Sequence, residues 1–190
     1  METINVEQRD FSVKPKKLRR LGKIPGSVLG KSLPETLPIQ MDESAARLLV
    51  TQLREGSKVQ LKLGAKTIPV QIKEKSVDTM NHQILQITFQ ALAAGEKINS
   101  VIHILLKNED KITDELEKVL LEIPYSSLPE DMIDTITIDL DGLKSGYILA
   151  IKDIPELMNK KIDLQVEPDN VVFRICERKI VVEETEEAAE

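Results

Sequence analysis

The most chemically distinctive segment of this 190-residue chain is a run of cations near its start. Six basic side chains fall within ten residues: Lys14, Lys16, Lys17, Arg19, Arg20 and Lys23. Each of them could neutralise one backbone phosphate, and arginine could add two parallel hydrogen bonds or a stacking contact. Pro15 and Gly22 bracket a segment too short to bury these side chains. From charge alone, two interpretations are equally good: a phosphate-binding surface and a solvated basic loop.

The formal charge is divided unevenly between the two halves of the chain. Residues 1–91 hold 15 Lys/Arg and 9 Asp/Glu, a net of +6, whereas residues 92–190 hold 11 and 23, a net of −12. Electrostatic fields act over about 8–10 Å at physiological salt, so this local balance matters more than the total of −6. Residues 12–31 contain seven bases and no acid. Polyanion binding is therefore expected in the first half and not in the second.

No residue pattern in the chain is typical of catalysis. His82 and His103 lie 21 positions apart, with no cysteine or carboxylate at metal-ligand spacing from either. The apolar neighbours of His103 favour a structural histidine over a catalytic one, and Cys176 has no nearby base, which favours a buried inert thiol. Neither G-x-G-x-x-G nor G-x-x-x-x-G-K-[ST] occurs. We expect no enzyme activity, no catalytic residue, no metal, no cofactor and no small-molecule substrate.

Alternation of apolar residues predicts strands through most of the first half. These strands are expected at 2–10, from Val28 onward, at 36–41, 59–63, 68–72 and 84–92. A helical turn is expected at 16–21, with Leu18 and Leu21 as its apolar contact. Asp42 is a good N-cap for a helix that continues to Leu53, and its apolar face is expected to hold Ala45, Leu48, Leu49 and Leu53.

The second half also has strands at a spacing of about ten residues, which is typical of an all-β sandwich or barrel. We expect strands at 101–106, 119–123, 133–140, 147–151, 162–166 and 171–176, and residues 113–117 could form a helical turn or a loop. The fold class is therefore mainly β with a few short helices. Residues 93–96 are expected to be a linker between domains at 1–92 and 93–182, and the glutamate-rich residues 183–190 are expected to be a disordered tail.

The compartment expected from the sequence is the cytoplasm. The first residues carry acids and lack a long apolar stretch, so no secretory signal or membrane span is expected. A single cysteine excludes an intramolecular disulfide and fits a reducing environment.

Two stretches resemble a known family. Residues 14–30, KPKKLRRLGKIPGSVLG, look like the N-terminal signature of bacterial large-subunit ribosomal proteins that bind 5S rRNA. Residues 126–149, SSLPEDMIDTITIDLDGLKSGYIL, are similar to the C-terminal pattern of its two-domain form, typified by the general stress protein Ctc. The resemblance implies a six-stranded, barrel-like N-terminal domain that grips 5S rRNA. It also implies an all-β second domain that projects from the central protuberance of the large subunit.

The same resemblance implies the partners and the residues that face RNA. The partners would be 5S rRNA and proteins of the large subunit, on cytoplasmic ribosomes, with a monomer away from the ribosome. The RNA-binding set would be Lys14, Lys16, Lys17, Arg19, Arg20, Gly22, Lys23, Gly30, Lys31, Gln86 and Thr88.

Three positions depart from the family pattern. A tyrosine usually precedes the glycine that ends the signature, and here that residue is Leu29. The last barrel strand usually reads His-hydrophobic-Asp-Phe, with the histidine and aspartate on RNA, whereas residues 86–89 read QITF. A basic residue common at the end of the first strand is replaced by Asp10, beside Arg9. Each lost polar or stacking contact would weaken binding by roughly 1–3 kcal/mol.

Two functions therefore stay open at the level of sequence. The first is a structural ribosomal protein that binds 5S rRNA through residues 12–31. The second is a diverged, stress-associated paralogue that acts as a protein-interaction module, with weak or no binding to 5S rRNA. Sedimentation with 50S subunits would distinguish them.

Overall fold

The computed structural model of this chain describes residues 2–31, 33, 35–112, 114–158 and 161–177. Within these residues the fold is mainly β with two short α-helices, which confirms the predicted class. The predicted acidic tail, residues 183–190, lies outside the described residues, as do residues 178–182 of the predicted second domain.

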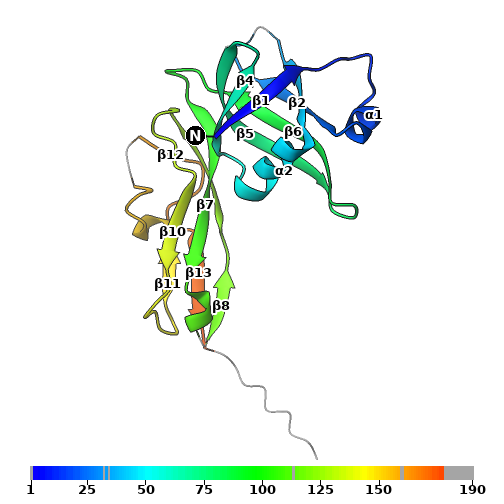
Figure 1. The fold of residues 1–190 in the computed structure, drawn as a ribbon. Coiled ribbons are helices and arrows are strands. Elements are labelled where there is room, and N and C mark those ends of the chain that lie inside the picture. Colours follow the sequence, from blue (N-terminus) through cyan, green and yellow to red (C-terminus); the bar gives the residue numbers. More distant parts are fainter. Residues whose placement is uncertain (1, 32, 34, 113, 159–160, 178–190) are drawn as a thin grey trace, which may run out of the picture.

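In the first part of the described chain, six strands close into a barrel (Figure 1). They are β1 (Glu2–Gln8), β2 (Lys23–Leu29), β3 (Leu37–Asp42), β4 (Lys58–Leu63), β5 (Lys66–Asp78) and β6 (Gln83–Ala91). Their order is β1-β3-β2-β6-β5-β4, and parallel pairing of β1 with β4 closes the sheet. Helix α1 (Pro15–Arg20) joins β1 to β2, and α2 (Glu43–Gln52) joins β3 to β4. The six-stranded barrel implied by the resemblance is confirmed.

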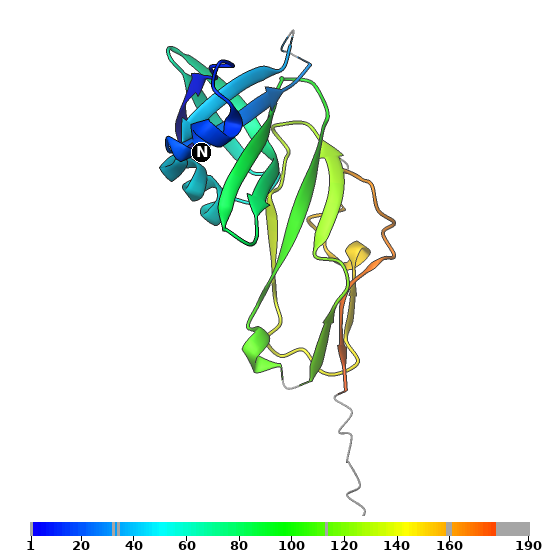
Figure 2. The ribbon, with the colours of Figure 1, turned by 90° about the vertical axis from the view of Figure 1, so that its right-hand side faces the viewer.

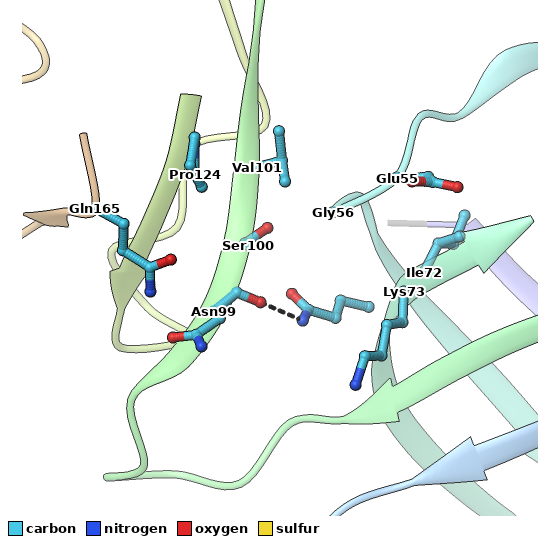
Figure 3. Close-up of a pocket in the computed structure, with 10 residues that line it drawn as sticks. Glu55, Gly56, Ile72, Lys73, Asn99, Ser100, Val101, Pro124 and Gln165 are labelled. Atoms are coloured by element: carbon cyan, nitrogen blue, oxygen red, sulfur yellow. Dashed lines mark hydrogen bonds between the residues drawn. The ribbon is translucent and has the colours of Figure 1, made fainter. Parts of the chain in front are cut away.

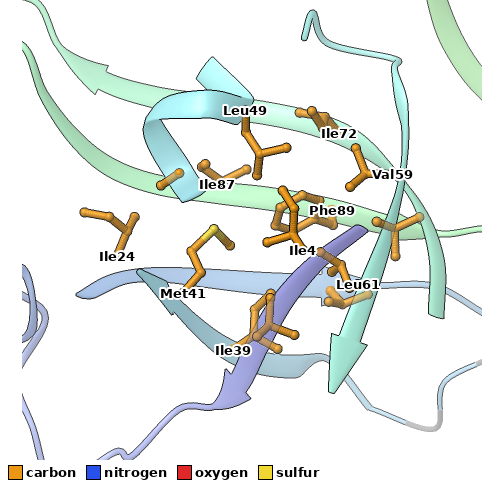
Figure 4. Close-up of a cluster of buried hydrophobic side chains, with 14 of the residues drawn as sticks. Ile4, Ile24, Ile39, Met41, Leu49, Val59, Leu61, Ile72, Ile87 and Phe89 are labelled. Atoms are coloured by element: carbon orange, nitrogen blue, oxygen red, sulfur yellow. The ribbon is translucent and has the colours of Figure 1, made fainter. Parts of the chain in front are cut away.

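The barrel is filled by the inward-facing residues of each alternating strand. Ile39, Leu61, Ile72 and Phe89 are each at most 1% exposed and meet at its centre (Figure 4). Because Leu, Ile and Val supply nearly all of this core, burial of apolar surface at about 25 cal/mol per Å² is its main stabilising term. Closure also leaves no long unpaired strand edge.

The second part of the described chain contains two further sheets. One has the order β10-β7-β9-β12 and the other the order β11-β13-β8. Their bounds are β7 (Ile98–Lys107), β8 (Glu115–Lys118), β9 (Glu122–Ser127), β10 (Thr135–Asp139), β11 (Ile148–Ala150), β12 (Asp163–Leu164) and β13 (Val171–Cys176), with 3-10 turns at Glu109–Lys111 and Ile151–Asp153. Strand β7 leads away from the barrel along the length of this part (Figure 2).

The apolar residues form two separate clusters. One includes residues from Ile4 to Ala91, and the other includes residues from Ile102 to Ile175. No residue of the described chain belongs to both clusters. This separation supports a boundary at 92–93, which stays a prediction.

Three strand predictions need correction. Strand β2 begins at Lys23 and ends at Leu29 rather than beginning near Val28, because its pairing with β3 already starts at Lys23. Residues 119–123 were expected as a strand, but 119–121 connect the two sheets, and both Val119 N and Leu120 N donate to Val172 O. Part of the ambiguous segment 113–117 is the strand β8, since its residues pair with β13.

Two strands of the second part are shorter than expected, whereas β13 has the predicted bounds. Strand β10 covers Thr135–Asp139 of the predicted 133–140, and β12 covers only Asp163–Leu164 of the predicted 162–166. Both pair at the edge of the same sheet, where fewer hydrogen bonds extend a strand.

Helix α2 begins and ends close to the predicted bounds, but its buried face differs. Ala46 and Leu49 are fully buried, whereas Leu48 was expected on that face and is exposed. The Asp42 side chain makes no capping bond because it pairs with Lys23. Lys75 of β5 instead secures the other end of α2, where its ammonium donates to Leu53 O, and burial lowers the pKa of Lys75.

The loop between α2 and β4 fastens the barrel to the second part (Figure 3). His103 Nε2 lies 2.9 Å from Glu55 O, which gives this buried histidine the hydrogen-bonded structural place predicted for it. The buried Gln71 donates from Nε2 to Asn99 O at 3.0 Å. Glu55, Gln71 and Asn99 are among the residues that line a cavity of about 230 Å³. The junction is therefore built from polar contacts between side chains and backbone.

Substitution of Gly56 tests how closely the barrel approaches the second part at this junction. Its φ of +87° disfavours any side chain, and an added Cβ would lie 2.7 Å from Ser100 Oγ. Gly64 is a matched control, with a φ of +59° and no atom within 4 Å of an added Cβ. We expect Gly64→Ala to cost about 1 kcal/mol of unfolding free energy and Gly56→Ala about 2–4 kcal/mol, measured by denaturant unfolding. Equal losses would mean that the junction is looser than described.

Candidate nucleic-acid interface

Helix α1 displays the basic segment on the outside of the barrel. Lys14 is extended and precedes Pro15, whose fixed φ suits the first position of a helix. The helix ends at Arg20 with Leu21 as its C-cap, and Gly22 follows with a φ of +74°, a conformation that favours glycine. Leu18 is buried and holds the helix against β2.

The predicted contact between Leu18 and Leu21 is wrong. Leu18 is 4% exposed, whereas Leu21 is 66% exposed. Leu21 has left the helical geometry, with a ψ of 7°, so its side chain is not on the buried face. A single leucine therefore anchors the basic helix.

Beside α1 the surface of the barrel forms a hollow of about 380 Å³. It is lined by Arg9, Pro15, Arg19, Pro25, Glu74, Ser76, Leu85, Gln86 and Thr88. Strand register explains this gathering, because Glu74 pairs with Thr88 and Ser76 with Gln86 on β5 and β6. Arg19 reaches across from α1, and its Nη1 donates to Leu85 O at 3.4 Å. The hollow therefore brings together residues of α1 and β6 that are at least 66 positions apart in the sequence.

Two arginines leave hydrogen-bond donors unused in this hollow. The Nε atoms of Arg9 and Arg19 are buried and find no acceptor among the described residues. An unpaired buried donor costs roughly 1–3 kcal/mol, more when the group is charged. Gln86 Nε2 is partly engaged, since it donates to Thr88 Oγ1 at 3.4 Å. Arg9 and Arg19 both line the hollow, so an anionic ligand bound there would lie beside two guanidinium groups.

The predicted site residues fall into three groups. Arg19, Gln86 and Thr88 meet in the hollow. Lys16, Lys17 and Arg20 are exposed on α1, and Lys14 is exposed at its start. Their charges extend the positive surface around the hollow.

Lys23 belongs to a third group whose charge is already compensated. Its Nζ lies 3.0 Å from Glu7 Oε2 and 3.2 Å from Asp42 Oδ1. The hydrogen bond to Glu7 raises the pKa of Lys23, and hydrogen bonds from Gln40 and Lys23 lower the pKa of Glu7. An RNA phosphate would have to compete with both carboxylates.

Gly30 and Lys31 lie beyond the opposite end of β2 from α1. The strand has seven residues, so this distance is roughly 20 Å. Lys31 Nζ pairs with Glu96 Oε1 at 2.8 Å, and this hydrogen bond raises the pKa of Lys31. A Cβ on Gly30 would lie 2.8 Å from the Ala91 Cβ, so Gly30 serves the packing of β2 on β6.

Sequence reasoning missed Arg9, Glu74 and Ser76 as members of the hollow. Arg9 follows β1 directly, and its backbone N donates to Pro38 O at 3.1 Å. Glu74 and Ser76 are two residues apart on a strand, so alternation alone could have placed them on one outer face. What sequence could not supply was the register that sets this face beside Gln86 and Thr88.

Asp10, the acid beside Arg9, is engaged locally. It accepts hydrogen bonds from the backbone N of Ser12 at 2.8 Å and from Ser12 Oγ at 2.7 Å. These bonds, chiefly that of the Ser12 hydroxyl, lower the pKa of Asp10. The carboxylate thus shapes the turn between β1 and α1.

Cys176 lies far from the hollow in sequence and is less buried than predicted. It was expected to be a buried thiol but is half-buried at the end of β13.

No helix in the described part of the chain has the length and apolar character needed to cross a bilayer.

Comparison with known proteins shows what this arrangement is similar to. Residues 4–89, which contain the barrel strands, α1 and the hollow, match the Ribosomal L25p family. The chain is similar to L25-type ribosomal proteins. The expected resemblance to a bacterial ribosomal protein is thereby confirmed, whereas its finer assignment to the Ctc form stays a prediction.

Similarity to individual proteins extends over the second part of the chain as well. The chain is 29% identical over 197 residues to the large ribosomal subunit protein bL25 of Chlorobium limicola, with all of both chains covered. It is 29% identical to that of Pelodictyon phaeoclathratiforme, covering 100% of this chain and 98% of the relative. It is 25% identical to that of Caldanaerobacter subterraneus, covering 92% and 88%. These alignments therefore cover both parts of this chain.

The anchoring of α1 can be tested with two leucines of the same segment. We expect Leu18→Ala to lower the free energy of unfolding by about 2–5 kcal/mol, because it removes a buried side chain. Leu21→Ala removes an exposed one and should change it by less than about 0.5 kcal/mol. Thermal or denaturant unfolding of both variants measures the difference. Similar losses would contradict the placement of Leu21.

Proposed function

We propose that this protein is a structural constituent of the large ribosomal subunit that binds 5S rRNA through the hollow and helix α1. The observation that carries the proposal is the pair of buried, unused guanidinium donors on Arg9 and Arg19. Phosphate oxygens are the acceptors that arginine pairs with best in nucleic acids. Exposed cations of α1 surround this point and would add sequence-independent attraction.

The rest of the lining favours RNA over a simple anion. Glu74 would repel a phosphate, but its carboxylate could accept a hydrogen bond from a ribose 2′-hydroxyl or a base amino group. Gln86 and Thr88 offer both donors and acceptors at the same face. These residue types differ from the histidine and aspartate of the family pattern, yet they can form hydrogen bonds at the same positions.

The second part would have a different role on the ribosome. It contains most of the acidic side chains of the chain, so we assign its contacts to proteins of the large subunit rather than to rRNA. The role is structural rather than catalytic, on cytoplasmic ribosomes, and the chain is a monomer away from them. Support for this assembly comes from the relatives named bL25.

Arg19→Ala tests the proposed RNA surface, and Lys31→Ala is its matched control. Both remove one cation from the basic segment, but Lys31 lies at the far end of β2 and is already paired. Arg19→Ala should weaken binding to 5S rRNA by about 10- to 150-fold, as expected for a lost charge-assisted contact. Lys31→Ala should weaken it by less than about threefold. Filter binding or fluorescence anisotropy across a salt series measures both.

The salt series adds a second criterion. With about four to six phosphates engaged, the slope of log affinity against log salt should be roughly −3 to −5 for the parent. The slope should be about one unit smaller for Arg19→Ala. Equal effects of the two variants would contradict the hollow as the contact. Absence of binding, together with failure to sediment with 50S subunits, would favour the protein-interaction alternative.

A further inference from the structure

Phe11 is the most exposed aromatic side chain of the described chain, at 73%. It lies in the turn between β1 and α1, directly before the basic segment. The chain has only five aromatic residues, and Phe89, Phe173 and Tyr125 are fully buried. An aromatic ring exposed beside a basic surface is available to stack on a nucleotide base.

Arg9 connects this ring to the hollow. Its Cζ atom lies 5.7 Å from the centroid of the Phe11 ring, within the range of a cation–π contact. The same side chain lines the hollow and leaves its Nε unused. A phosphate bound at Arg9 would therefore lie one side chain away from the exposed ring.

Phe11 also lines a hollow other than the one that Arg9 lines. Phe11, Leu37 and Pro38 line a second hollow of about 510 Å³, together with the carboxylate of Glu35. That carboxylate would repel a phosphate but could accept a hydrogen bond from a base amino group. Phe11 thus has the cation of Arg9 at its ring and an acidic residue, Glu35, in the hollow that it lines. A nucleotide fits this order with its phosphate at Arg9 and its base at Phe11.

We propose that Phe11 is a stacking platform for one unpaired base of the bound RNA, which enters the second hollow while its phosphate is held by Arg9. This inference rests on the proposed function and adds the kind of nucleotide that is bound. It also places an aromatic contact at the β1–α1 turn, whereas the family's usual tyrosine position holds Leu29. Leu29 is half-buried on β2 and provides no ring.

Affinity measurements test this proposal with two RNAs. Phe11→Ala should weaken binding to 5S rRNA by about five- to 150-fold, the range for one stacked base, without changing the salt slope. On a fully paired RNA duplex the same variant should bind within about twofold of the parent, since no unpaired base is available. Phe11→Tyr should keep the affinity for 5S rRNA. Because the side chain is exposed, both variants should melt like the parent.

Fluorescence provides an independent readout, because the chain contains no tryptophan. Phe11→Trp introduces a single reporter at the proposed stacking position, and Val119→Trp introduces one at a 56% exposed position of the second part. On saturation with 5S rRNA, emission from Phe11→Trp should be quenched and its accessibility to acrylamide should fall. Emission and accessibility should not change for Val119→Trp.

The possible failures are distinguishable. If the parent binds 5S rRNA and Arg19→Ala weakens binding, but Phe11→Ala binds normally or loses equally on the duplex, the stacking proposal is overturned and the proposed function stands. Unchanged fluorescence of Phe11→Trp at saturation would overturn it as well. If the parent does not bind 5S rRNA at all, the proposed function and the stacking proposal both fall.

Discussion

The parallel pairing of β2 with β6 is the contact on which the candidate site depends. It brings Gly26 so close to Ile87 that a Cβ there would lie 2.9 Å from the Ile87 backbone oxygen. No other residue type allows this approach without a shift of the backbone. Since α1 packs on β2, the same pairing sets the basic helix beside the outer face of β6. Gln86 and Thr88 reach the hollow only because this register holds.

The basic segment is not a uniform patch once it is folded. Lys23 and Lys31 are paired with carboxylates, whereas the cations of α1 are exposed and the guanidinium groups of Arg9 and Arg19 keep unused donors. Charge density in the sequence therefore overstates the number of cations available to RNA. The specific part of the surface is smaller, and it consists of the two arginines with polar side chains of β5 and β6.

Much of the fold could be predicted from sequence because alternation and turn residues are local signals. These signals predict most of the barrel strands and α2, and the family resemblance supplies the closure of the barrel. The exposure of Leu21 and the strand β8 could not be predicted, because one depends on the geometry where α1 ends and the other on pairing with a distant strand. The place of Arg9 in the site could not be predicted either, since only the folded barrel sets the end of β1 beside Arg19.

The central claim is that RNA binds at the hollow and α1, and photo-crosslinking of the full chain to 5S rRNA tests it most directly. Mass spectrometry of the crosslinked peptides would show which residues contact nucleotides. The account predicts crosslinks within residues 9–20 and at the β5 and β6 positions that line the hollow, with none in residues 98–176. Crosslinks confined to residues 98–176, with the hollow unmodified, would contradict it.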